Sequence, residues 1–463
     1  MIIGIIIICI TCFYAYLFLK LIGHYRSITE NIGLSYLIGL GCFTYFMFLL
    51  NWLKFSFSIK TGLLLIFSLT TLTLILNFYI FGFIFKKPKF NFSNKKLLNF
   101  LKRISFWQKI LIFNLSFIFI SVVSKTSYWP VSNWDSIVLY DYLAKQFASK
   151  GFIDYGLESA FLGYPFLVSL SHAWLYAFQI FQAGLIHSLF YISFLLVIFG
   201  FLKRKTSFSW SLIFTSFLAL SSPFIDHAFM TYTNLAYSIY LSLSFIYFID
   251  WHVEHKDSSA LIAFILLSLS TWTRSIEPFW MLSLGLAVAL ALLSKNKRNI
   301  IILMLGIFLV LSVRFSWFSY KKQISQQMNF VSTTALQMEQ DDYYSQPLLH
   351  RLNFQKVQES TKYFIYYILV PTKTYYLIFT LSGLIFIINY RKSIFKSELL
   401  SLFSIILINT LIIYMGIIYF SINYPDWKNI GGSATRMALF INPLILYTTA
   451  LICFDLLKTK KRS

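Results

Sequence analysis

The sequence of 463 residues has little charge. Only 12% of its residues are charged, whereas 58% are hydrophobic and 20% are aromatic. A soluble globular domain carries about 25% charged residues. This chain therefore has too few charges to cover a surface that faces water, and most of its surface must face lipid. The composition excludes a soluble enzyme, a disordered protein and a secreted disulfide scaffold.

Cysteine is also scarce. The four cysteines, Cys9, Cys12, Cys42 and Cys453, all lie in apolar stretches. Cys9 and Cys12 have a CxxC spacing, but no second pair of ligands completes a zinc site. The cysteines therefore do not indicate a metal or redox centre.

Acidic residues are few as well: 17 Asp and Glu stand against 39 Lys and Arg, for a net charge of +22. Binding of nucleic acid would require the positive charges to gather on one folded face. Here they lie in short runs between apolar segments, as the positive-inside rule predicts. We therefore expect membrane lipids, and no nucleic acid, as partners.

Apolar runs predict an all-α integral membrane protein, a polytopic bundle of about 13 transmembrane helices, since a span needs about 20 mostly apolar residues. The runs lie near residues 2–19, 32–53, 61–85, 109–127, 183–202, 208–225, 235–249, 259–273, 278–294, 299–318, 375–389, 397–420 and 435–454. The stretch 161–182 is also apolar, but it begins with Tyr164-Pro165 and contains His172. It predicts an interfacial or re-entrant helix on the outer face.

The distribution of Lys and Arg predicts the topology. The first segment has no basic n-region and no cleavage site, so we do not expect a signal peptide. Its first cation, Lys20, follows the span, which favours an N-terminus outside and a C-terminus in the cytoplasm. Loops then assigned to the cytoplasm hold most of the Lys and Arg, and the stretch 86–109 is basic without any acid. These features predict a multi-pass protein of the cytoplasmic (inner) membrane.

We expect two parts along the chain. Residues 1–108 form an N-terminal part of three transmembrane helices with a basic cytoplasmic loop. Residues 109–463 form the main membrane domain, with two long outer loops at 128–182 and 319–374.

Four of the acids fall in the first outer loop, and none lies near the centre of a predicted span. A helix over residues 132–147, ending near Gly151, carries Asp135 and Asp141. At 3.6 residues per turn these two lie about 120° apart, so they do not share a face. Asp135 either caps this helix, which is the plainer interpretation, or takes part in chemistry.

Three further outer features carry charge. A polar turn between two spans contains Asp226 and His227, Arg274 follows a span in Thr273-Arg274-Ser275-Ile276-Glu277-Pro278, and Arg436 precedes the last span. The two arginines are either interfacial anchors that extend toward lipid headgroups or phosphate ligands, for which the planar guanidinium is suited.

Taken in order, these motifs resemble a family. They are Trp134-Asp135 in a first outer loop, an amphipathic helix ending in glycine, Tyr164-Pro165 before the next membrane segment, the Arg274 motif, and Gly431-Gly432-Ser433-Ala434-Thr435-Arg436. The set is similar to membrane glycosyltransferases of the GT-C type, within which the bacterial relatives of protein O-mannosyltransferases and lipid A aminoarabinose transferases look nearest. The resemblance covers roughly residues 109–456.

The resemblance implies a transferase of the cell envelope that moves a sugar from a polyprenyl-phosphate donor to an acceptor hydroxyl at the outer face. It implies Asp135 as the general base, Asp141 as a second candidate, and Arg274, Arg436 and His227 as ligands of the donor phosphate. The acceptor is a lipid, a glycan or a protein. A divalent cation, Mg²⁺ or Mn²⁺, is left open, with Asp226 as its candidate ligand, because the chain has Asn234 where the family often carries an Asp.

The chemistry agrees with this placement. A carboxylate deprotonates the acceptor hydroxyl, and a cation stabilises the departing phosphate. Direct displacement by the acceptor inverts the anomeric centre.

Two other functions stay open. A lipid-linked oligosaccharide ligase or polymerase would depend on cations and histidine in a late outer loop, which here contains Lys321, Lys322, His350 and Arg351. A polytopic transporter or flippase would carry charges within spans and paired broken helices, and the sequence shows little of either.

Overall fold

The computed structural model describes residues 2–24, 26–81, 104–152, 164–294, 296–328, 354–390, 393–423, 427–430 and 435–460. All regular secondary structure in these ranges is helical, which confirms the all-α prediction. The chain divides into two compact units. Unit 1 comprises Met1–Asp154 and Phe166–Ala236, and unit 2 comprises Tyr155–Pro165 and Tyr237–Ser463. The sequence predicted a boundary between two parts of the chain after residue 108. That boundary does not coincide with the division into these two units, and it stays a prediction.

Several predicted features lie outside the described residues. They are most of the basic stretch 86–109, the acids Asp154 and Glu158, residues 329–353 of the second outer loop with His350 and Arg351, and the segment 431–434 before Arg436.

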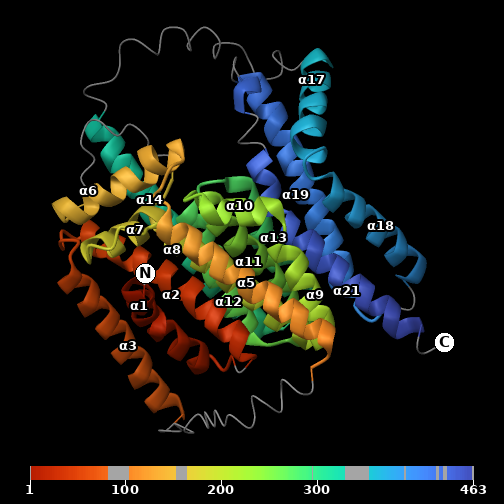
Figure 1. The fold of residues 1–463 in the computed structure, drawn as a ribbon, viewed down its shortest axis with the longest axis horizontal. Helices are drawn as coiled ribbons and strands as arrows, with labels where there is room; N and C mark the ends of the chain where they lie inside the picture. Colours follow the sequence, from red (N-terminus) through yellow and green to blue (C-terminus); the bar gives the residue numbers. More distant parts are fainter. Residues whose placement is uncertain are drawn as a thin grey trace. The chain divides into compact units, whose positions relative to one another are not determined.

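The described residues of unit 1 form ten helical elements, drawn from red to green in Figure 1. They are α1 (Ile2–Leu21), α2 (Ile28–Trp52), α3 (Ile59–Phe81), α5 (Phe106–Tyr128), the π-helical turn η1 (Ser136–Asp141), α6 (Tyr142–Lys150), α7 (Leu167–Ala177), α8 (Gly184–Lys205), α9 (Phe208–Ala219) and α10 (Ser222–Phe229).

Unit 2 contains most of α11 (Thr233–Glu254), which begins in unit 1, and the elements that follow it. These are α12 (Asp257–Thr273), α13 (Glu277–Ser294), α14 (Lys297–Met328), α17 (Phe354–Phe364), η2 (Ile365–Leu369), α18 (Lys373–Asn389), α19 (Lys396–Asn423), η4 (Trp427–Ile430), η5 (Ala438–Phe440) and α21 (Asn442–Lys460).

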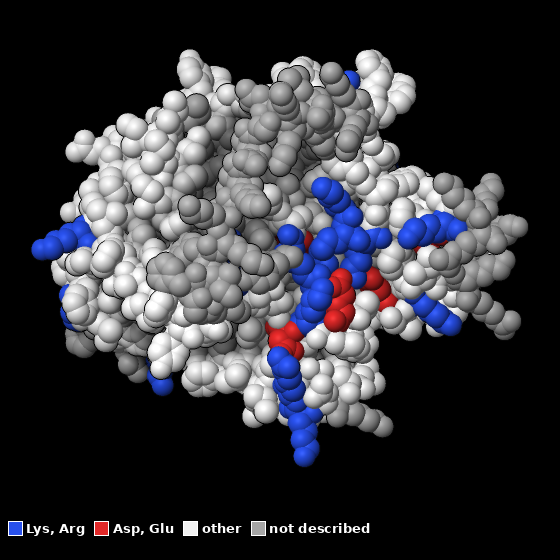
Figure 2. Space-filling view, turned by 90° about the horizontal axis from the view of Figure 1, so that it is seen from below, with Lys and Arg blue, Asp and Glu red and all other residues white. Residues whose placement is uncertain are grey.

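Nine helices of the described residues are long and apolar enough to cross a membrane, and there are up to 11 such spans if two bent pairs count as one span each. The nine are α1, α2, α3, α5, α8, α13, α14, α19 and a last span at Thr435–Lys458. The chain is therefore a multi-pass membrane protein. Uncharged side chains dominate the face drawn in Figure 2, and charged ones occupy a small share of it.

The predicted count of about 13 is not confirmed, and four predicted spans account for the difference. Residues 208–225 fall in a pair of helices bent by 60°, and 375–389 fall in a pair bent by 90°. The helix α12, at 17 residues, is shorter than the other candidates, and α11 is not among them. The α11 sequence contains several Ser and Tyr residues and Asp250, which lower its hydropathy although the helix is buried.

The helices α1, α2 and α8 form the core of unit 1 and lie side by side in Figure 1. Glycines allow α2 and α8 to approach closely, as small residues do where membrane helices pack. A Cβ atom added to Gly33 of α2 would lie 2.4 Å from the Ser193 carbonyl oxygen of α8. One added to Gly200 of α8 would lie 2.4 Å from Ser27 Oγ. Neither position therefore accepts a larger residue without a shift of the helices.

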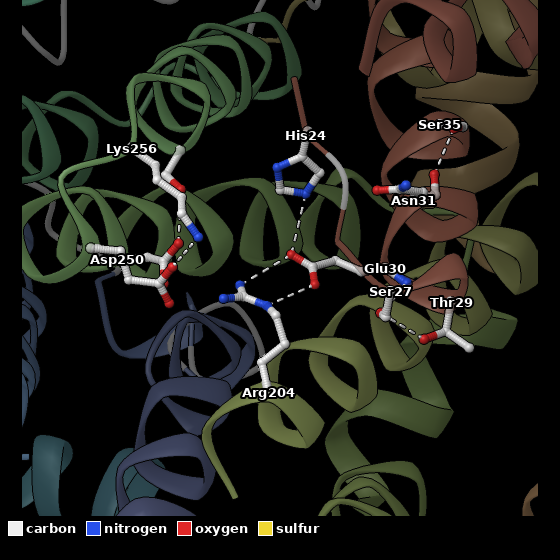
Figure 3. A network of polar contacts seen from close by, with 11 residues as sticks. His24, Ser27, Thr29, Glu30, Asn31, Ser35, Arg204, Asp250 and Lys256 are labelled. Carbon is white, nitrogen blue, oxygen red and sulfur yellow. Dashed lines mark hydrogen bonds and ion pairs between the residues drawn. The ribbon is translucent and has the colours of Figure 1, made fainter. Parts of the chain in front are cut away.

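A buried ion pair joins the start of α2 to the end of α8 (Figure 3). The Glu30 carboxylate is fully buried, and it accepts hydrogen bonds from Arg204 Nε at 3.1 Å and Nη2 at 3.3 Å. His24 Nε2, from the loop after α1, lies 3.3 Å from the same carboxylate. We call His24, Glu30 and Arg204 the Glu30 cluster. It fixes the α1–α2 connection against α8, at the end where α8 carries Lys203, Arg204 and Lys205.

Candidate functional site

Asp135 lies in unit 1, in the connection between α5 and α6. Residues Ser136–Asp141 form a π-helical turn directly after it, and this turn continues into α6. Asp135 occupies the N-cap position of that turn, but its side chain makes no capping hydrogen bond. The side chain is half-buried. The side-chain hydrogen bond expected of a capping residue is therefore not made at this turn.

Large exposed aromatic side chains surround this position along the chain. Tyr128 and Trp129 at the end of α5 are 81% and 64% exposed, and Trp134 is 76% exposed. Tryptophan and tyrosine are enriched at membrane–water interfaces, where their rings lie at the level of the headgroups. Because α5 is a candidate span, the segment 128–134 has the character of an interfacial belt, with Asp135 directly after it.

The end of the predicted outer helix is confirmed. α6 ends at Lys150, and Gly151 adopts the left-handed conformation with φ of 72°. Its amide donates to the Phe147 carbonyl oxygen at 3.1 Å. Glycine is the residue that tolerates this geometry at a helix end. The glycine therefore ends this short helix at Lys150.

Asp141, the second acidic candidate, has a different environment. It is only 4% exposed. It accepts a short hydrogen bond from the Tyr176 hydroxyl of α7, and its Oδ2 lies 2.7 Å from Lys145 Nζ, one turn further along α6. His172 Nδ1 of α7 lies 4.0 Å from Oδ1. We call Asp141, Lys145, His172 and Tyr176 the Asp141 cluster.

Histidines continue this cluster into the unit. The rings of His172 and His187 of α8 lie 5.6 Å apart, and both side chains are fully buried. Burial lowers the pKa of His172 to about 4, although the nearby Asp141 charge opposes the shift. His172 is therefore neutral at pH 7. The same burial raises the pKa of the Tyr176 hydroxyl, and its hydrogen bond to Asp141 adds to the effect.

Asp226 and His227 lie on α10, which begins at Ser222 with Pro223 in its first turn. Asp226 is exposed and accepts a hydrogen bond from Ser222 Oγ at 2.8 Å. His227 is buried, and its Nδ1 lies 2.8 Å from the Pro223 carbonyl oxygen. Adjacent positions on a helix point in different directions, so these two side chains have separate surroundings. Among the described residues, no group of three His, Cys, Asp or Glu side chains is arranged to hold a metal ion.

The predicted phosphate ligands lie in unit 2. Arg274 is half-buried at the C-terminal end of α12. Its guanidinium lies over the Tyr164 ring, 4.7 Å from the centroid, and its Nη2 donates to the Tyr164 hydroxyl at 3.0 Å. Arg436 is half-buried in the turn that opens the last span. The aromatic ring thus holds one guanidinium in a fixed direction.

A second arginine near Arg274 was not predicted. Arg314 lies within the candidate span of α14, forms an ion pair with Glu277, and donates to Ser275 Oγ at 2.7 Å. A charge within a span is costly and usually pairs with another. The motif Thr273–Pro278 therefore contains the partners of a membrane-embedded arginine.

The structure thus divides the predicted residues between the units. Asp135, Asp141, Asp226 and His227 belong to unit 1, and Arg274 and Arg436 belong to unit 2. Sequence reasoning missed His187, Tyr176 and Arg314 as members of polar clusters. A lone cation within an apolar run was the signal for Arg314, and no local signal pairs Tyr176 with an acid 35 residues earlier.

We found no protein family, no curated protein and no solved structure that matches this chain.

Proposed function

We propose that this chain is a GT-C-type membrane glycosyltransferase. In this proposal it transfers a sugar from a polyprenyl-phosphate donor to an acceptor hydroxyl at the outer face of the cytoplasmic membrane. The observation that carries the proposal is the place of Asp135, a half-buried carboxylate directly after the exposed aromatic residues that follow the candidate span α5. The phosphate of a polyprenyl donor lies at this level of a membrane, since its tail is in the hydrocarbon layer.

In the proposed reaction Asp135 accepts the proton of the acceptor hydroxyl. The acceptor oxygen forms a bond to the anomeric carbon, and the bond from that carbon to the phosphate oxygen breaks. Polyprenyl phosphate leaves with the electron pair, and the configuration of the sugar inverts. A positioned carboxylate is suited to this proton transfer. Arg274, held by Tyr164, keeps its proposed role as a phosphate ligand, and so does Arg436.

The proposal includes an orientation with the N-terminus outside. α5 then runs outward, which agrees with the basic stretch before it and the aromatic residues after it. It also places Lys203, Arg204 and Lys205 at the cytoplasmic end of α8. Single cysteines at Ser149 and Thr206 test this orientation through labelling by an impermeant maleimide in intact cells, in a background in which the four native cysteines are replaced. Labelling at 149 alone is expected, and labelling at 206 alone would reverse the orientation.

The central test measures transfer from radiolabelled polyprenyl-phosphate sugars in membranes. Asp135→Asn is expected to lower transfer by about 10²- to 10⁴-fold, the usual contribution of a general base. Asp257→Asn is the matched control. It makes the same change in a carboxylate that forms an ion pair with Arg298 in unit 2. Equal transfer by the wild type and Asp135→Asn would remove Asp135 from the reaction.

A transporter or flippase is the second candidate, because bent helix pairs occur in both units. α9 and α10 form one pair, and the segment Phe354–Leu369 with α18 forms the other. Broken helices in corresponding halves are a feature of transporter sites. In proteoliposomes, a flippase would move a fluorescent polyprenyl-phosphate sugar between leaflets without forming a new glycosylated product. That result would replace the transferase proposal.

A further inference from the structure

The carboxylate of Asp141 ties three elements of unit 1 together. It lies at the end of η1, receives the Tyr176 hydroxyl from α7 and pairs with Lys145 of α6. Tyr140, the residue before it, reaches the Thr233 hydroxyl at 3.2 Å. The C-terminal end of the π-helical turn is therefore held from several sides.

Charge explains why this attachment is firm. A buried carboxylate is stable only when its charge is paired and its oxygens accept hydrogen bonds. Lys145 Nζ supplies the positive charge at 2.7 Å, and its side chain remains 62% exposed. Tyr176 supplies a neutral donor that stays protonated, because burial raises its pKa. Asp141 therefore has a fixed set of partners.

The histidine that faces Asp141 does not compete with Lys145 as a cation at pH 7. His172 faces it from α7 at 4.0 Å and is neutral because burial lowers its pKa. The ring of His187 of α8 lies 5.6 Å from that of His172, and His227 of α10 is a further histidine near His187. Lys145 is thus the cation within ion-pair distance of Asp141 among the described side chains.

Asp135 depends on this attachment. It lies directly before Ser136, the first residue of η1, so the backbone of this turn sets where its side chain begins. The turn is held by the Ile137 amide, which donates to the Asn133 carbonyl oxygen at 3.0 Å, and by the contacts of its last residue. A movement at Asp141 would therefore be transmitted along a single turn to Asp135.

We propose that Asp141 is a positioning residue: bound by Tyr176 and Lys145, it holds the η1 turn so that the Asp135 carboxylate faces the reacting hydroxyl. This inference rests on the proposed function only for the role of Asp135. The attachment itself is independent of any activity. In this proposal Asp141 positions the base, whereas the family resemblance implied Asp141 as a second candidate for the base itself.

The first measurement needs no substrate. Carbodiimide coupling of glycine ethyl ester to the full-length protein in detergent is followed by mass spectrometry, and labelling of Asp135 is divided by that of the exposed Asp226. The ratio is expected to rise severalfold in Asp141→Asn and in Tyr176→Phe. Tyr142→Phe is the matched control, because Tyr142 lies in α6, next to Asp141, and is an exposed residue. An unchanged ratio in both test variants would overturn the proposal.

The second measurement is transfer by the same variants. Loss of alignment is expected to lower kcat by about 10- to 100-fold and to leave KM for the donor nearly unchanged. The double variant Asp141→Asn/Tyr176→Phe should have a kcat no lower than that of the more affected single variant, since the two residues act as one unit. A normal kcat with a raised labelling ratio would refute a role in catalysis.

The variants distinguish a loss of folding from a loss of positioning. Tyr176→Phe changes one hydroxyl, so it is the variant to rely on if Asp141→Asn does not give a monodisperse protein. If the wild type transfers no sugar but the labelling ratio rises, the attachment of η1 stands and the proposed function fails. If the wild type is active and the ratio does not change, the positioning proposal fails alone.

Discussion

Among the described residues of unit 1, a buried charged cluster lies near each end of α8, and the two clusters are built differently. In the Glu30 cluster a carboxylate meets a guanidinium through two hydrogen bonds and has a histidine beside it. In the Asp141 cluster the carboxylate meets a tyrosine and the end of an exposed lysine, and the nearest histidine is neutral. His187 and Arg204 mark these ends, separated by roughly 25 Å at 1.5 Å per residue.

The difference indicates different tasks. A bidentate guanidinium–carboxylate pair is directional and strong, and here it joins the start of α2 to the end of α8. A tyrosine and a flexible lysine hold a carboxylate without a full pair of buried charges. This second arrangement is suited to a turn that must be placed accurately yet lies beside a reaction. Three changes test the comparison.

The largest effect is expected from Glu30→Gln, which removes the only acid of the Glu30 cluster. Arg204, whose side chain is 17% exposed, would lose its charge partner. Removing one member of a buried ion pair typically costs about 3–5 kcal/mol of the free energy of unfolding. Denaturation by SDS in mixed micelles measures this loss. The control is Glu254→Gln, in a pair whose lysine is 53% exposed, where we expect about 0–1 kcal/mol. Equal losses would mean that the two pairs are equivalent.

The next largest effect is on the pH dependence of stability, and it arises from His172 in the Asp141 cluster. The pKa of His172 is lowered from 6.5 to about 4 in the folded state, so the unfolded state binds a proton that the folded state does not. Stability from this residue is present above pH 6.5 and is lost as the pH falls toward 4, by up to about 3 kcal/mol. His172→Asn should therefore flatten the loss of thermal stability between pH 7 and pH 4.5. The idea fails if the two proteins lose stability in parallel.

The smallest effect concerns the packing that holds the Glu30 end. In Gly200→Ala the new methyl group would lie 2.4 Å from Ser27 Oγ and 2.8 Å from Glu30 Cβ. Overpacking of this kind typically costs about 1–3 kcal/mol. At Gly285 of α13 a Cβ atom meets nothing within 4 Å, so Gly285→Ala should be neutral or stabilising by up to about 1 kcal/mol. A shift in thermal midpoint of the same sign for both variants would contradict the packing argument.

The long apolar helices could be predicted from the sequence because their length and hydropathy are enough to identify them. The end of α6 at Gly151 and the basic end of α8 were also visible, since each depends on neighbouring residues. The bend between α9 and α10 was missed, because 208–225 contains no charged residue and its apolar residues continue past Ser221, Ser222 and Pro223. A hydropathy count does not register a change in helix direction.

The polar clusters required the tertiary structure. Asp141 and Tyr176 are 35 residues apart, and Glu30 and Arg204 are 174 apart. Spacing along one helix predicts neither pair. It did predict that Asp135 and Asp141 would not share a face, which agrees with one being half-buried and the other buried. The catalytic roles of these residues stay predictions that transfer assays will decide.

The attachment of α8 at both ends has a consequence for the lipid around it. A free transmembrane helix adapts to a thicker or thinner bilayer by tilting or by shifting its end residues. α8 has less freedom to do so, because Arg204 is bound at one end and His187 is buried beneath the Asp141 cluster at the other. Unit 1 therefore presents a nearly fixed hydrophobic thickness, and lipids of unsuitable acyl length must stretch or compress to match it.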